Sequence, residues 1–162
     1  MRVVRLTEDE WITLRDLRLR ALTQDPDAFG SQLGREQGFR ETHWRMRLRS
    51  SAWFAGYADA DETPSGLVDV IEEPGAGPDD RHVVALWVAP ERRRQGLGAT
   101  LLDHACRWAQ ADGGTTVSLW VAQDATTAIA FYRAAGFVPT GTVMPHPRDA
   151  SRLDERWSRS LG

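Results

Sequence analysis

One stretch of the chain combines glycine and arginine in a pattern that could bind a phosphate. It reads Leu86-Trp87-Val88-Ala89-Pro90-Glu91-Arg92-Arg93-Arg94-Gln95-Gly96-Leu97-Gly98, an apolar run that passes through a glycine-containing turn into a helical pattern. At such a junction, backbone N–H groups and the positive end of the helix dipole converge. Gly96 and Gly98 let a phosphate approach the backbone, and the neighbouring arginines can bind it in bidentate fashion. The stretch predicts an anion site, and a solvated strand-to-helix turn is the alternative.

Composition excludes several other phosphate and cofactor sites. The 162 residues include 20 arginines and no lysine, which excludes a Walker P-loop, a kinase-type phosphate lysine and a pyridoxal phosphate Schiff base. A dinucleotide fingerprint is excluded too, because Leu101 stands where its third glycine would be and Val121 where its acidic residue would be. Cys106 is the one cysteine in the sequence, so neither a disulfide framework nor a multi-cysteine zinc site is expected.

Length and charge indicate one globular domain over residues 1–162, with net charge −3 and 41% hydrophobic residues. Residues 51–80 carry eight acidic residues and no basic one, whereas the two flanking segments are mildly basic. No segment has the basic density of a nucleic-acid surface. The apolar runs are far shorter than the roughly 18 residues of a membrane span, and Glu8, Asp9 and Glu10 interrupt any signal peptide. We therefore expect a cytoplasmic protein without nucleic-acid or membrane partners.

The N-terminal part reads as helical. Thr7 and Glu10 form a capping box before a helix over about Glu8–Thr23, which Asp25-Pro26 ends. Glycines 30, 34 and 38 predict a loose segment, followed by a helix over Glu41–Arg49 with Arg45, Arg47 and Arg49 on its solvent face.

The rest of the chain is expected to contain six strands and two helices. The nearly continuous apolar run of His82–Val88 is typical of a strand covered on both faces, and the strand–helix–strand order favours a right-handed crossover in a mixed sheet. Loops are expected over Glu72–Arg81 and residues 144–151. The expected strands are Trp53–Ala58, Gly66–Ile71, His82–Val88, Thr115–Val121, Phe137–Val143 and Arg152–Ser160, and the expected helices are Gly98–Asp112 and Ala125–Ala135.

Three segments together resemble a known family. Arg93-x-x-Gly96-x-Gly98 after Val88-Ala89-Pro90 resembles the coenzyme A pyrophosphate loop of the GNAT superfamily of N-acyltransferases. Downstream, Ala128-Ile129-Ala130-Phe131-Tyr132-Arg133-Ala134-Ala135-Gly136-Phe137 resembles the second motif of that family. Leu19–Leu22 through Pro26–Gly30 is similar to its acceptor-side helical segment. The order and spacing fit from about residue 3 to residue 160.

The resemblance implies an α/β (α+β) fold. It consists of a single GNAT-like domain whose mixed, mostly antiparallel sheet has six to seven strands, helices on both faces, and splayed parallel fourth and fifth strands. The implied activity is transfer of an acetyl group from acetyl-CoA to a primary amine of a small molecule, by direct attack in a ternary complex and without a metal. A protein N-terminal or lysine acetyltransferase and a catalytically silent acyl-CoA-binding module are the alternatives. A homodimer is left open.

The resemblance also assigns cofactor-binding residues. The backbone of the fourth strand, at Leu86, Trp87 and Val88, would pair with the pantetheine, and the amides of Gln95–Ala99 would hold the pyrophosphate. Two positions depart from the family pattern: Arg94 stands where glycine is usual, and Ala125 stands where asparagine is common. The full expected set is Leu86, Trp87, Val88, Arg93, Arg94, Gln95, Gly96, Leu97, Gly98, Ala99 and Ala125.

Two catalytic roles follow from the same resemblance. Tyr132 matches the acid that protonates the departing thiolate, with an aromatic packing role as the alternative. His82, whose ordinary pKa near 6.5 suits proton removal at neutral pH, is the expected base, with a structural or exposed histidine as the alternative. Glu72, Glu73 and Asp69 are alternatives. A backbone N–H near Val88 would polarise the carbonyl. The other histidines, His43, His104 and His146, have no metal-ligand spacing and are read as surface or packing residues.

Acceptor choice is expected to depend on three segments. The acidic residues of 51–80 would attract a cationic amine, although a merely soluble hairpin is the alternative. Residues 27–40 and 144–151 would line the rest of the acceptor site.

Overall fold

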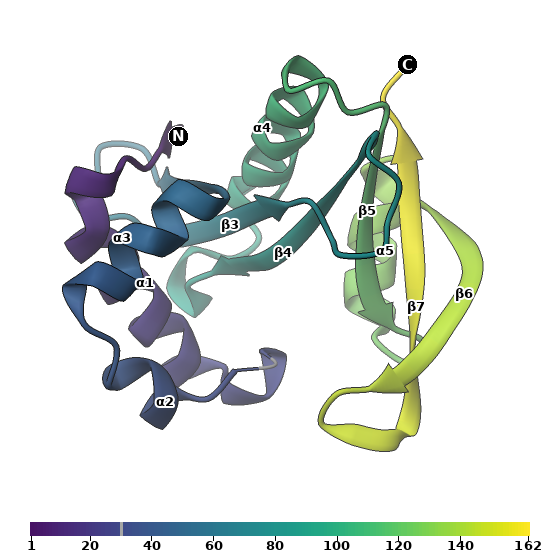
Figure 1. Cartoon of the computed structure of the whole chain (residues 1–162), viewed down its shortest axis with the longest axis horizontal. Helices are drawn as coiled ribbons and strands as arrows, with labels where there is room; N and C mark the ends of the chain where they lie inside the picture. The colour runs from purple at the N-terminus through teal and green to yellow at the C-terminus, as the bar shows by residue number, and fades with distance from the viewer. Residues whose placement is uncertain (30) are drawn as a thin grey trace. The chain divides into compact units, whose positions relative to one another are not determined.

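The computed structural model describes residues 1–29 and 31–162, in which seven strands follow the hydrogen-bonded order β1-β2-β3-β4-β5-β7-β6 (Figure 1). Gly30 lies outside the described residues. Strand β4 pairs with β5 in parallel, whereas β1–β2, β2–β3, β5–β7 and β6–β7 are antiparallel. This is the mixed sheet that the sequence predicts. The strands are β1 (Arg2–Arg5), β2 (Ala52–Tyr57), β3 (Gly66–Ile71), β4 (Asp80–Val88), β5 (Thr116–Ala122), β6 (Val138–His146) and β7 (Asp149–Ser160).

Five helices accompany these strands in the described residues. They are α1 (Trp11–Gln24), α2 (Leu33–Gln37), α3 (Glu41–Ser50), α4 (Leu97–Ala111) and α5 (Thr126–Ala134), with short 3-10 turns at Glu8–Glu10, Pro26–Ala28 and Pro90–Arg92. None of the helices in the described ranges is long and apolar enough to span a bilayer.

The chain divides into two compact units, each of which is described by itself. The first comprises Met1–Ile71 and Val83–Arg107, and the second Glu72–His82 and Trp108–Gly162. One domain over residues 1–162 therefore stays a prediction.

Helices cover both faces of the sheet in the first unit. On one face, the buried side chains of α1 and α3 pack with those of β2 and β3, among them Leu14, Trp44 and Trp53. On the other face, a Cβ on Gly66 of β3 would lie 2.7 Å from Leu101 of α4. Each large apolar side chain buried in this way stabilises the fold by about 1.5–3 kcal/mol.

The predicted capping box is present before α1. The Thr7 N–H donates to the Glu10 carboxylate at 2.9 Å, and the Glu10 N–H donates to the Thr7 carbonyl at 2.9 Å. The 3-10 turn of Glu8–Glu10 then leads into α1, which ends at Asp25-Pro26 as expected.

The segment after α1 was mispredicted in two respects. Leu33–Gln37 forms the short helix α2 instead of a loose stretch, because Glu36 is fully buried and must be positioned against two arginines. Glu36 accepts from Arg18 at 3.0 Å and from Arg47 at 2.9 Å. Arg47 is thus not on the solvent face of α3, since it neutralises a buried carboxylate there.

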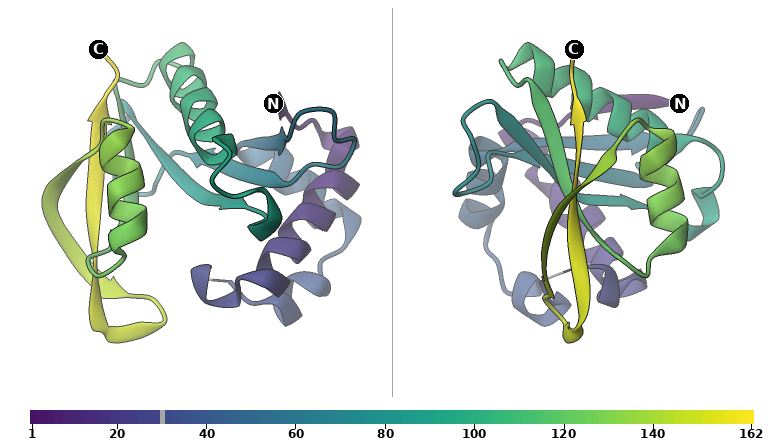
Figure 2. Two further views of the ribbon diagram at one scale, coloured as in Figure 1. Left: turned by 180° about the vertical axis from the view of Figure 1, so that it is seen from behind. Right: turned by 90° about the vertical axis from the view of Figure 1, so that its right-hand side faces the viewer.

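The second unit places α5 along one face of β5 and β7, as both views of Figure 2 show. Arg133 of α5 stacks over the Trp157 ring of β7 at 5.3 Å. Residues 144–151 do not form the expected loop. Strand β6 extends to His146 and β7 begins at Asp149, which lies opposite His146 in the antiparallel register, so only Pro147 and Arg148 form a turn between the strands.

Strand β4 is irregular at its centre. Ala85 has φ +58°, a left-handed conformation that is unfavourable for residues other than glycine. Val84, Ala85 and Leu86 are only half-buried, so the expectation of a strand covered on both faces is wrong for this part. In the described residues, parallel pairing of β4 with β5 is restricted to Asp80–Thr116, Arg81–Val117 and His82–Ser118. Beyond His82, β4 belongs to the first unit and β5 to the second, so the expected splay of the fourth and fifth strands stays a prediction.

Candidate active site

The start of α4 in the first unit has the geometry of an anion site. Gly96 has φ +91°, and its carbonyl accepts the first helical hydrogen bond, from the Thr100 N–H at 3.0 Å. The N–H groups of Leu97, Gly98 and Ala99 precede that bond, so the helix itself offers them no acceptor. They point out of the helix N-terminus, where the macrodipole favours negative charge.

The three arginines beside this helix start have different roles. Arg93 donates to the Val88 carbonyl at 2.8 Å and to Asp25 at 2.7 Å, and Arg92 pairs with Asp61 at 2.6 Å. Arg94 is exposed and has no hydrogen-bond or ion-pair partner within residues 1–29 and 31–162. Arg94 is therefore the guanidinium best placed to meet an incoming anion, whereas Arg93 braces the turn.

The backbone conformation of Arg94 bears on its departure from the family pattern, in which glycine is usual at this position. Its φ is +61°, in the left-handed region that favours glycine. The position thus has the backbone conformation that a glycine would adopt without strain, and in this chain an arginine adopts it instead.

The expected pantetheine strand is only partly buried near its end. Leu86 and Val88 are half-buried, and Trp87 is buried with its indole N–H donating to Asp25 at 2.7 Å. The Val88 carbonyl already accepts from Arg93.

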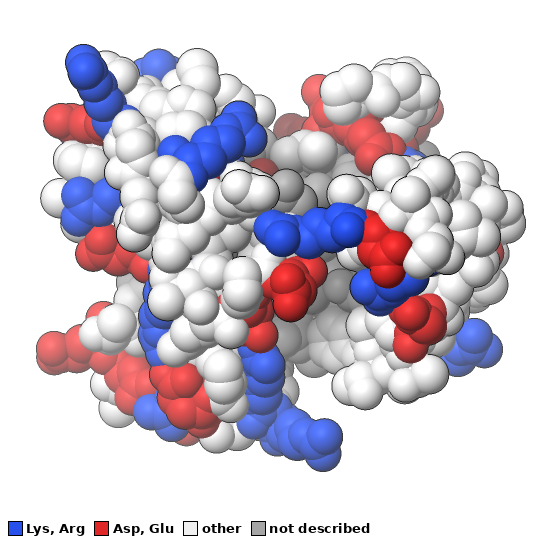
Figure 3. All heavy atoms as spheres, turned by 90° about the horizontal axis from the view of Figure 1, so that it is seen from below, with Lys and Arg blue, Asp and Glu red and all other residues white. Residues whose placement is uncertain are grey.

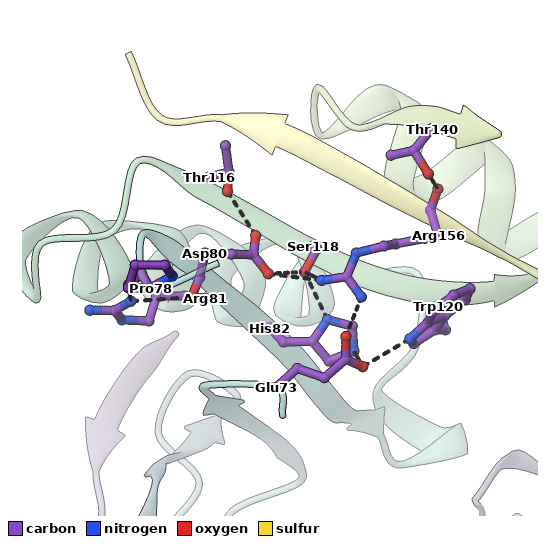
Figure 4. Close-up of polar contacts among 10 residues, drawn as sticks. All are labelled: Glu73, Pro78, Asp80, Arg81, His82, Thr116, Ser118, Trp120, Thr140 and Arg156. Atoms are coloured by element: carbon purple, nitrogen blue, oxygen red, sulfur yellow. Dashed lines mark hydrogen bonds and ion pairs between the residues drawn. The ribbon is translucent and has the colours of Figure 1, made fainter. Parts of the chain in front are cut away.

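A polar cluster gathers around His82 in the second unit (Figure 4). His82 is only 2% exposed, and its Nδ1 lies 2.8 Å from the Ser118 hydroxyl of β5. Its Nε2 lies 3.2 Å from Glu73, whose carboxylate also accepts from Trp120 at 2.9 Å and from Arg156 of β7. The strand pairing of β4 with β5 and of β5 with β7 brings these side chains to one face.

Burial and charge set the protonation of this cluster. Burial lowers the pKa of His82 below its ordinary value, although Glu73 opposes the effect. Burial alone would raise the pKa of Glu73, but hydrogen bonds from Arg156 and Trp120 outweigh it and lower that pKa. At neutral pH the cluster therefore holds a neutral imidazole against a carboxylate.

A cavity of about 460 Å³ adjoins the cluster. Glu73, Trp120 and Arg156 line it, whereas buried His82 does not. This volume lies within the range of small-molecule sites, about 300–1,000 Å³. A ligand in this cavity could contact Glu73 directly, whereas His82 lies behind Glu73 and Ser118, which both line the cavity.

Glu72 and Asp69, which the sequence also offers as a base, have surroundings unlike those of Glu73. Glu72 is exposed and pairs with Arg81 at 3.4 Å. Asp69 of β3 belongs to the first unit, where burial raises its pKa to about 7.

Tyr132 lies on α5 in the second unit, half-buried, with its ring edge-on to Phe131 and Phe137. Burial raises the pKa of Tyr132 to about 12. Its hydroxyl has no hydrogen-bond partner among the residues described, so it keeps a proton to donate at neutral pH.

Ala125 precedes α5 without a side-chain cap, and the neighbouring Asp124 binds Arg152 at 2.7 Å. Tyr132 and His82 belong to the second unit, and the Arg93–Ala99 turn belongs to the first.

The remaining histidines are engaged by protein groups. His43 stacks on Phe39 at 3.7 Å, His104 contacts the Thr100 carbonyl at 3.0 Å, and His146 pairs with Asp154 at 2.8 Å. Within the described ranges, no three His, Cys, Asp or Glu side chains are grouped to hold a metal ion.

The acidic residues of 51–80 are largely neutralised by pairing. Asp61 pairs with Arg92, and both Glu73 and Asp80 pair with Arg156. On the face drawn in Figure 3, arginine and carboxylate side chains lie interspersed. The sequence total of eight acids therefore overstates the charge available to attract a cation.

Sequence reasoning missed Ser118, Arg156, Trp120 and Asp80. One signal was present: Thr116, Ser118 and Trp120 alternate with apolar residues along β5. Polar residues at every second position of a strand share one face, which marks a polar lining.

Two curated relatives match parts of the chain. Mycothiol acetyltransferase of Rothia mucilaginosa is 38% identical over 93 residues, 52% of this chain and 26% of that protein. The N-terminal acetyltransferase B complex catalytic subunit naa20 of Schizosaccharomyces pombe is 32% identical over 80 residues, 46% of this chain and 44% of that protein. The matches thus span less than half the length of these relatives.

A solved structure is similar over the whole chain. Aminoglycoside 6'-N-acetyltransferase complexed with coenzyme A has a TM-score of 0.72 and 17% identity, covering 100% of this chain and 98% of that chain. At this identity the likeness establishes the fold. Residues 11–137 match the model of the Acetyltransferase (GNAT) family. The chain therefore belongs to the GNAT family of acetyltransferases.

Proposed function

We propose that this chain transfers the acetyl group of acetyl-CoA to a primary amine of a small molecule. The observation that carries the proposal is the start of α4, where three N–H groups without helical acceptors follow Gly96 at φ +91°. These donors and the exposed Arg94 fit the pyrophosphate of coenzyme A. The coenzyme A named with the aminoglycoside acetyltransferase supports this ligand.

The chain's own residues supply three functions in this proposal. The α4 N-terminus orients the thioester by holding the pyrophosphate. The His82–Glu73 pair takes a proton from the acceptor amine. Tyr132 donates a hydrogen bond to the sulfur as negative charge develops there, since its raised pKa keeps its proton in place.

The proposed acetyl transfer accounts for every proton and bond. An ammonium loses one proton to the His82–Glu73 pair, and its nitrogen lone pair then forms the N–C bond while the C–S bond breaks. The nitrogen loses its second proton as the amide forms. One of the two protons ends on sulfur, giving the free thiol of coenzyme A, and the other passes to water.

Thiol release from acetyl-CoA tests the proposal across a panel of amino sugars, polyamines, amino acids and peptides with free N-termini. The expected result is amine-dependent thiol release with a small amine. Release with peptides alone would favour a protein acetyltransferase. Binding of acetyl-CoA by calorimetry without release for any amine would indicate a silent acyl-CoA-binding module.

The anion site has a separate test. Gly98→Asp adds bulk and negative charge at the α4 N-terminus, and we expect weaker acetyl-CoA binding by calorimetry. Unchanged affinity in a folded variant would place the pyrophosphate elsewhere.

A further inference from the structure

The Ser118 hydroxyl lies at the centre of the polar cluster and touches three groups. Its Oγ is 2.6 Å from Asp80, 2.7 Å from an Arg156 nitrogen and 2.8 Å from His82 Nδ1. Figure 4 shows these contacts converging from β4, β5 and β7. Ser118 is 1% exposed, so solvent does not compete for them.

Hydrogen-bond accounting assigns a direction to each contact. A serine hydroxyl has one proton to donate and two lone pairs that accept. The Asp80 carboxylate, which also binds Arg156 at 2.8 Å, can only accept, and a guanidinium can only donate. The Ser118 proton therefore goes to Asp80, and Ser118 accepts from Arg156. Its remaining lone pair requires that His82 Nδ1 be the donor.

This direction determines the other ring nitrogen. A neutral imidazole with a proton on Nδ1 carries its lone pair on Nε2. That lone pair faces the Glu73 carboxylate at 3.2 Å. Two acceptors face each other there, and the position between them is where an arriving proton would be bound.

We propose that Asp80, Ser118 and Arg156 are positioning residues that fix His82 as the Nδ1–H tautomer, so that Nε2 and Glu73 together accept the proton of an amine bound in the adjacent cavity. The catalytic part of this inference rests on the proposed function, whereas the tautomer does not. Glu73 contacts the amine, because it lines the cavity, and His82 stabilises the proton from behind.

The charged groups that face His82 come from three segments. They are Glu73 before β4, Asp80 at the start of β4 and Arg156 of β7. Arg156 pairs with both carboxylates. Removing Arg156 would leave two buried or half-buried carboxylates without a cation, so Ser118 is the better residue to vary.

Nitrogen-15 correlation spectra of the imidazole side chains test the tautomer in the wild-type protein at pH 8, where His82 is neutral. The four histidines make assignment feasible, with His82→Gln identifying the signals that disappear. We expect a protonated Nδ1 and a bare Nε2. A protonated Nε2 with a bare Nδ1, or two protonated nitrogens, would overturn the proposal without any bearing on acetyl transfer.

Steady-state kinetics of Ser118→Ala test the positioning role with an amine found active in the panel. We expect kcat to fall by at least about 10-fold with a small change in the KM of the amine, because the wrong tautomer cannot accept the proton. Ser118→Thr keeps a hydroxyl and should recover kcat, and Ser160→Ala on the exposed end of β7 is the matched control. A Ser118→Ala protein with wild-type tautomer and kcat would overturn the proposal, and if that variant does not fold, the wild-type spectrum decides.

Discussion

The Asp25 carboxylate at the end of α1 lies 2.7 Å from the Arg93 guanidinium at the turn before α4. The same carboxylate oxygen accepts from the Trp87 indole at 2.7 Å. One acid thus links the end of β4 to the anion-binding turn, two features that the sequence motif alone does not connect.

Asp25→Ala should weaken coenzyme A binding and lower the free energy of unfolding by about 1–3 kcal/mol, because it leaves the Trp87 indole without its acceptor and Arg93 without its carboxylate partner. Calorimetry and urea unfolding measure the two effects. Asp27→Ala, in the next 3-10 turn and exposed, is the control and should change neither. Equal effects of the two variants would contradict the bracing role of Asp25.

Two substitutions of Arg94 separate the effect of its backbone strain from the effect of its charge. Arg94→Gly and Arg94→Ala both remove the guanidinium, and both should raise the Kd of coenzyme A. Because glycine adopts the φ of +61° without strain, Arg94→Gly should be more stable to urea than Arg94→Ala by about 1 kcal/mol. If alanine were the more stable of the two, the left-handed assignment would be wrong.

Tyr132→Phe keeps the ring packing and removes the donor proton. We expect kcat to fall by about 10²–10⁴-fold, the usual contribution of an acid in the transition state. Since the pKa of Tyr132 is raised to about 12, its own titration should not appear in the pH profile of the wild-type enzyme below pH 10. A kcat within about twofold of wild type would reduce Tyr132 to a packing residue.

The raised pKa of Asp69 should make the stability of the protein fall between acidic and neutral pH. Its pKa rises on folding from 3.8 to about 7, so the stabilisation from its protonated form is present below pH 3.8 and is lost as the pH rises through 7. Asp69→Asn cannot ionise, and its stability advantage over wild type should grow by on the order of 2 kcal/mol between pH 5 and pH 8. Urea unfolding at both values measures this growth. A constant difference would show that Asp69 is ionised throughout.

The sequence predicted the parts of the molecule that local patterns encode. The capping box at Thr7 and Glu10, the hairpin of β2 and β3, and the turn before α4 all depend on residues close in the chain. The polar cluster depends on strand register instead: Ser118 meets His82 only because β5 pairs in parallel with β4, and Arg156 joins them only through β7. The prediction that Arg47 faces solvent was wrong for a similar reason. Its partner Glu36 lies on α2, in a segment whose glycines predicted a loose stretch instead of a helix.

Transfer of a labelled acetyl group tests the central claim most directly. The protein is incubated with acetyl-CoA labelled in the acetyl group and one amine from the panel, and the amine is isolated and analysed by mass spectrometry. We expect the label in an amide of a small amine, in an amount equal to the thiol released, and its near loss with Tyr132→Phe. Two results would contradict the assignment as an N-acetyltransferase. One is hydrolysis of acetyl-CoA, in which thiol is released but no amine or peptide carries the label. The other is binding of acetyl-CoA with no transfer at all.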